Sequence, residues 1–80
     1  MLDYQERMFN EFKELDERTK KLMEFIYNEK HKELGLSEDE VVDLRCQLYA
    51  MQAYRDALGR RCVRQGIAIP NAERYMPRGQ

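Results

Sequence analysis

The chain has 80 residues, of which 36% are charged and 42% hydrophobic, and its formal net charge is −1. This length allows one small domain at most. Only 4 Gly and 2 Pro are present, which favours long helices over a sheet with its many turns. A domain of this size buries little apolar surface alone, so we expect it to associate with further copies.

Charge is distributed unevenly along the chain. Residues 1–54 carry 8 Lys and Arg against 13 Asp and Glu, whereas residues 55–80 carry 6 Arg against 2 acids. The basic end could meet the acidic end of a neighbouring copy, a small anionic ligand, or nucleic acid. The basic segment is short and the rest of the chain is acidic, which argues against DNA.

The first predicted helix covers residues 4–33. Asp3 and Glu6 have the spacing of a capping box at its start. Apolar residues then alternate at intervals of four and three, as in a heptad seam. The seam consists of Met8, Phe12, Leu15, Thr19, Leu22 and Ile26.

A turn follows this helix. Gly35 can adopt the left-handed conformation that ends a helix, and Ser37 and Glu40 form a second capping box. The second predicted helix covers residues 38–65, with Gly59 inside it and Gly66 at its end. A glycine inside a helix lowers its stability; Gly59 either allows a close backbone approach there or is a neutral substitution without a structural role. Residues 67–70 read as an extended apolar strap, and the last ten residues are polar.

We therefore predict an all-α fold: an antiparallel two-helix hairpin over residues 1–66 with a short extended C-terminal tail over 67–80. The second predicted helix has its own apolar seam, which consists of Leu44, Leu48, Met51, Leu58 and Cys62. The two seams match along their length when the chain is folded at Gly35. They are wider than one partner helix can cover, so we expect hairpins to associate into a helical bundle, a homo-oligomer. The residues left to be covered are Phe9, Met23, Phe25, Tyr27, Cys46, Ala50, Ala53 and Ala57.

The two cysteines do not form a disulfide framework. Cys46 and Cys62 are 16 residues apart on one predicted helix, which separates them by roughly 24 Å and exceeds disulfide reach. Unpaired thiols, with no signal peptide and no apolar run long enough to cross a bilayer, lead us to expect a cytoplasmic protein without membrane contact.

No catalytic or metal-binding pattern is present in the sequence. The single histidine, His31, lies in a lysine-rich helix end, where we expect it to be solvated, and Ser37 is explained by capping. There is no glycine-rich phosphate loop and no Cys/His ligand spacing. We expect neither enzymatic activity nor a cofactor.

Arginine and tyrosine residues beside the seams suggest a binding site instead. Arginine side chains could hold phosphates, tyrosine rings could stack on a base, and a glutamine could read a polar edge. Arg55 is the clearest case, because it occupies a seam position; it could equally pair with Asp16 or Glu11 across the hairpin. The candidate ligand-binding residues are Arg7, Arg18, Arg55, Arg61, Tyr4, Tyr54 and Gln47.

Two stretches resemble a known family. The first is Tyr4–Met8 with Glu11, Leu15–Arg18, Lys21–Leu22 and Phe25–Ile26. The second is Gln47–Met51 with Tyr54, Leu58 and Arg61. The pattern resembles small helical proteins of tailed phages, first annotated in crAss-like phages. This resemblance implies a phage origin, the cytoplasm of an infected bacterial host and a compact helical hairpin. It assigns no role to any residue.

In size and helical character the chain is similar to phage sponges that sequester the nucleotide signals of Thoeris or CBASS immunity, an analogy of type alone. Our leading hypothesis is an anti-defence protein that binds a cyclic ADP-ribose-like molecule or a cyclic dinucleotide at protomer interfaces. The alternative is a helical adaptor or inhibitor that docks on a host protein. A hydrolase acting on the same signals is a third possibility.

Overall fold

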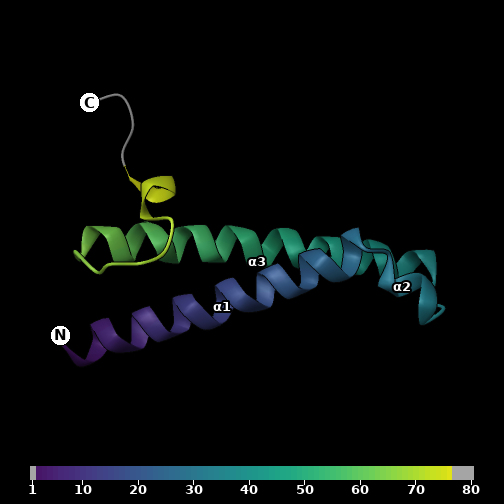
Figure 1. The fold of residues 1–80 in the computed structure, drawn as a ribbon, viewed down its shortest axis with the longest axis horizontal. Helices are drawn as coiled ribbons and strands as arrows, with labels where there is room; N and C mark the ends of the chain where they lie inside the picture. The colour runs from purple at the N-terminus through teal and green to yellow at the C-terminus, as the bar shows by residue number, and fades with distance from the viewer. Residues whose placement is uncertain (1, 77–80) are drawn as a thin grey trace.

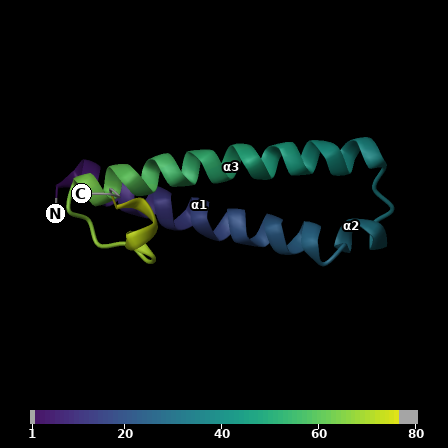
Figure 2. The ribbon, with the colours of Figure 1, turned by 90° about the horizontal axis from the view of Figure 1, so that it is seen from above.

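A computed structural model describes residues 2–76, in which every regular element is a helix and none is a strand. The elements are α1 (Asp3–Tyr27), α2 (Lys30–Glu33), α3 (Glu38–Arg64) and the 3₁₀ helix η1 (Ala72–Tyr75). Figures 1 and 2 show α1 and α3 side by side, running in opposite directions, with α2 and the turn at one end and η1 near the other. The all-α prediction is confirmed for these residues.

The N-terminal end of α1 lies one residue before the predicted start. The cap residue is Leu2, whose backbone N–H donates to Oε1 of Gln5 at 3.2 Å. The predicted capping box of Asp3 and Glu6 is therefore wrong. Both acids still lie in the first turn of α1, where they interact favourably with the helix dipole.

The predicted first helix is interrupted near its end, which corrects the range 4–33. Helix α1 ends at Tyr27, and Glu29 has a φ of 58°, a left-handed conformation that breaks the helix. The chain then resumes as the single turn α2. This change of direction buries His31, which is 8% exposed, against the ring of Phe25, with ring centroids 6.5 Å apart. The prediction of a solvated histidine is wrong.

The turn between α2 and α3 has the predicted caps. Gly35 has a φ of +68°, and the backbone N–H of Leu36 donates to the His31 carbonyl at 3.2 Å, the bond that defines a Schellman ending. Ser37 then accepts a hydrogen bond from the Glu40 backbone N–H at 3.2 Å. Helix α3 therefore begins at Glu38 as predicted, and it ends at Arg64 rather than Gln65.

The main core lies at the open end of the two long helices, away from the turn. Helices α1 and α3 contribute five residues, and the segment after α3 contributes three more. These buried residues are Met8, Phe12, Leu15, Leu58, Cys62, Ile67, Ile69 and Tyr75. The apolar strap thus packs on its own protomer, and the core contains residues on both sides of the predicted boundary at residue 66. Residues 77–80 of the predicted tail lie outside the described residues.

Toward the turn, the seam is thinner and partly polar. Thr19 is fully buried, and its hydroxyl donates to the Leu15 carbonyl at 2.7 Å. Ile26 and Leu48 are buried, but Leu22 and Leu44 are only half-buried. Within residues 2–76 we find no helix with the length and apolar character needed to span a membrane.

Candidate ligand-binding site

Five of the seven predicted ligand residues lie along one side of the helix pair, which we call the polar edge. It consists of Tyr4, Glu11 and Arg18 on α1 and Gln47, Tyr54 and Arg61 on α3. Successive members on each helix are seven residues apart, nearly two full turns, and therefore share one face. All six side chains are exposed.

One hydrogen bond joins the two helices at the centre of the polar edge. The Tyr54 hydroxyl donates to Oε1 of Glu11. Because α1 and α3 run in opposite directions, a step of seven residues along both helices brings Arg18 toward Gln47 on one side of this bond. The opposite step brings Tyr4 toward Arg61. The spacing therefore arranges the six side chains as three facing pairs, of which the central pair is hydrogen-bonded.

The other contacts along the polar edge are weak. Arg18 approaches the exposed carboxylate of Glu14 only at 3.9 Å, and exposed pairs of this kind contribute little. Gln47 Nε2 lies 3.9 Å from Sδ of Met51. Tyr4 donates a hydrogen bond to Oε1 of Gln65 at 2.8 Å, at the open end. Arg18 and Gln47 can thus reorient toward a ligand at small cost.

The remaining two predicted residues lie elsewhere. Arg55 is 5% exposed; its Nη1 lies 3.8 Å from Oδ1 of Asp16 and its Nε 3.2 Å from Oδ1 of Asp56. The structure thus contains the ion pair with Asp16 that the sequence left as an alternative, and two carboxylates compensate the buried charge. Arg7 is exposed one turn after Tyr4, beside the polar edge.

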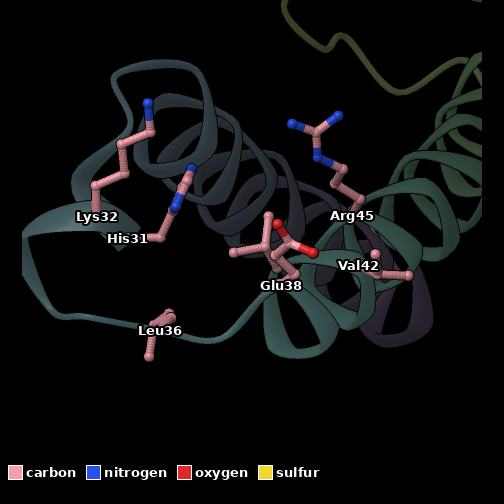
Figure 3. A pocket seen from close by; sticks show the side chains of 7 residues that line it. His31, Lys32, Leu36, Glu38, Val42 and Arg45 are labelled. Carbon is pink, nitrogen blue, oxygen red and sulfur yellow. The ribbon is translucent and has the colours of Figure 1, made fainter.

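Sequence reasoning missed a pocket at the turn end of the molecule. It has a volume of about 440 Å³ and lies between α2, the turn and the first turns of α3 (Figure 3). Its position could have been anticipated from Leu36 and Val41, which have the spacing of a hydrophobic staple, next to the basic run Lys30–Lys32. The lining residues are His31, Lys32, Leu36, Glu38, Val41, Val42 and Arg45.

Burial is the largest cause of the pKa shifts of two groups in the core. Burial raises the pKa of the Cys62 thiol, and burial likewise raises the pKa of the Tyr75 hydroxyl. Both groups belong to the core at the open end. Among residues 2–76, no cluster of three or more His, Cys, Asp or Glu side chains could hold a metal ion.

Comparison with protein-family models matches residues 2–64 to the family described as Sequestin. The chain belongs to the Sequestin family. The Sequestin match includes the polar edge and the turn-end pocket, and it stops at the last residue of α3, before the strap and η1. Neither the curated proteins nor the solved structures contain a match to this chain.

Proposed function

We propose that this Sequestin-family protein is a phage anti-defence protein that sequesters a nucleotide-derived immune signal without turning it over. The signal would be a cyclic ADP-ribose-like molecule or a cyclic dinucleotide. The observation that carries the proposal is the family match over residues 2–64, because the family name denotes sequestration. The polar edge adds the side-chain types that such a ligand needs.

Different residues of the polar edge would contact different parts of the ligand. Arg18 and Arg61, with Arg7 beside them, would hold phosphates through forked hydrogen bonds. The exposed rings of Tyr4 and Tyr54 would stack on the base. The amide of Gln47 would form hydrogen bonds with polar groups of the base. Arg55 would act indirectly, since its ion pair with Asp16 lies in the same helix interface.

A second protomer would complete this site. Binding pockets bury most of a small ligand, whereas the polar edge is an exposed surface on one protomer. Two polar edges facing each other would enclose the ligand. Exposed apolar side chains elsewhere, such as Tyr27 and Leu34 near the turn, favour association of protomers as well.

Thermal unfolding with a panel of cyclic dinucleotides and ADP-ribose derivatives tests this proposal. A bound ligand at one hundred times its Kd should stabilise the protein by about 2.7 kcal/mol. The Arg18→Gln, Arg61→Gln double variant should lose the shift, and Lys21→Gln, an exposed change on α1, should keep it. Intact ligand should be recovered after heat denaturation. A flat melting temperature across the panel would overturn the proposal, and recovery of a cleaved product would indicate a hydrolase instead.

The alternative function, a helical adaptor that docks on a host protein, is favoured by a different surface. Val42 and Tyr49 are 57% and 65% exposed on the outer face of α3, with the small residues Cys46, Ala50 and Ala53 beside them. Capture of one host protein from infected-cell lysate, lost in Tyr49→Asp but retained in the Arg18→Gln, Arg61→Gln variant, would favour the adaptor. Light scattering also separates the two, because the interface site requires a stable oligomer.

A further inference from the structure

The turn-end pocket is separate from the polar edge. Arg45 and Gln47 are two residues apart on α3 and therefore point about 200° apart around the helix axis. The pocket is also formed within one protomer, by α2, the turn and the start of α3. A ligand bound there would require neither the polar edge nor a second copy of the chain.

The histidine is the most informative residue of the pocket. His31 is only 8% exposed, yet its ring forms no hydrogen bond within residues 2–76. No side-chain nitrogen or oxygen that is sealed from solvent lacks a partner in this part of the chain. The ring nitrogens of His31 are therefore not fully sealed, and because the residue lines the pocket, a ring N–H can donate to an anion bound there.

Two cationic side chains stand at the rim of the pocket. Figure 3 shows Lys32 beside His31 on one side and Arg45 on the other. Lys32 is paired with Glu29 at 3.1 Å, whereas Arg45 has no carboxylate within 4 Å among residues 2–76. An unpaired guanidinium opposite an imidazole suits a phosphate, which the guanidinium can bind through two parallel hydrogen bonds.

The rest of the lining suits a planar ring rather than more phosphate. Leu36, Val41 and Val42 supply an apolar surface, and the volume of about 440 Å³ lies in the range of small-molecule sites. Glu38 also lines the pocket; its carboxylate can accept N–H groups at the edge of a ring and would repel additional phosphates. The lining thus favours one phosphate joined to a base that carries N–H donors.

We propose that the turn-end pocket is a second binding site, within each protomer, for a nucleoside monophosphate whose base presents N–H donors. His31 and Arg45 hold the phosphate, the ring packs on Val41 and Val42, and Glu38 accepts from the base. This proposal goes beyond the interface site and stands without it.

The chain has one histidine, so the ring proton signals of His31 in NMR spectra of the untagged protein report on this pocket alone. Guanosine monophosphate is the probe, with guanosine and inorganic phosphate as its two halves. We expect the monophosphate to shift the His31 ring proton signals in a saturable way. The concentration needed should be at least tenfold lower than that of guanosine or of inorganic phosphate. Arg45→Gln should weaken this binding about tenfold, the loss of one charged hydrogen-bond pair. Arg18→Gln, on the polar edge, should leave it unchanged.

Three results would overturn the proposal: no shift with any compound, an equal response to inorganic phosphate, or unchanged binding in Arg45→Gln. Arg45 is exposed, so its replacement should leave the fold intact, which circular dichroism checks. If cyclic nucleotides raise the melting temperature while the His31 signals stay still, the pocket proposal fails and the interface proposal survives. If the His31 signals respond to guanosine monophosphate while the Arg18→Gln, Arg61→Gln variant binds cyclic nucleotides unchanged, the pocket proposal survives and the interface proposal fails.

Discussion

The ring of Tyr75 lies directly on the backbone of Gly59. A Cβ at residue 59 would be 2.8 Å from Cε2 of Tyr75, and the same ring meets Phe12 edge to face, with centroids 5.9 Å apart. Glycine inside a helix costs about 1 kcal/mol relative to alanine. Of the two explanations left open by the sequence, close approach therefore accounts for Gly59: it is the docking point of the segment after α3.

Gly59→Ala is expected to destabilise the protein, because the new methyl group collides with the Tyr75 ring. Overpacking of this kind costs about 1–3 kcal/mol. In a Tyr75→Ala background the collision is absent, and the same change should stabilise α3 by about 1 kcal/mol. Urea unfolding of the four proteins measures this reversal of sign. Stabilisation by Gly59→Ala in both backgrounds would contradict the contact.

Ile69→Ala should weaken the fold although residue 69 lies in the predicted tail. Ile69 is buried in the main core, and removing such a side chain costs about 2–5 kcal/mol. Its neighbour Ala68 is exposed, so Ala68→Ser serves as the control and should change the free energy of unfolding by less than about 0.5 kcal/mol. Equal effects of the two changes would show that the strap does not pack on the helices.

The ion pair of Arg55 and Asp16 should stabilise less than its burial suggests. Asp16→Ala leaves the buried guanidinium with Asp56 alone and should cost about 1–3 kcal/mol. Arg55→Met removes the charge and keeps the volume, so stability should be unchanged or higher. Glu14→Ala breaks only the exposed contact with Arg18 and is the control. A large loss in Arg55→Met, measured by denaturant unfolding, would mean that the pair stabilises the fold outright.

The two thiols should react at very different rates. Cys46 is exposed and Cys62 is fully buried, and burial raises the pKa of Cys62 despite the opposing effect of Arg61. The thiolate is the reactive form, so a maleimide should label Cys46 in the native protein and Cys62 only on unfolding. Mass spectrometry of the timed reaction measures both, and Cys46→Ser should abolish the fast phase.

Stability should fall at alkaline pH through Tyr75. Burial raises the pKa of this hydroxyl above its ordinary value; smaller effects of Arg55 and Arg74 lower this pKa, and those of Asp56 and Asp16 raise it. The folded protein then holds the proton more tightly than the unfolded chain, so the stabilisation is present below about pH 10 and is lost as pH rises further. Tyr75→Phe should flatten this dependence in urea midpoints between about pH 9 and 11. An unchanged slope would exclude Tyr75 as its source.

The sequence by itself determined the local elements. The caps at Gly35 and Ser37 depend on contacts only three to five residues apart, and such short-range rules can be read from residue types. The spacing of seven along the polar edge is likewise visible in the sequence. The burial of Met8, Phe12 and Leu15 follows from the heptad pattern.

Tertiary packing decided the rest. The left-handed conformation of Glu29 has no local signal, because a non-glycine residue adopts it only when surrounding contacts require it. That break moved His31 from the expected surface into a pocket. The contact of Gly59 with Tyr75 likewise joins residues 16 positions apart, and the Tyr54–Glu11 bond joins two helices. Contacts between distant residues depend on how helices pack, and residue spacing along one helix carries no record of them.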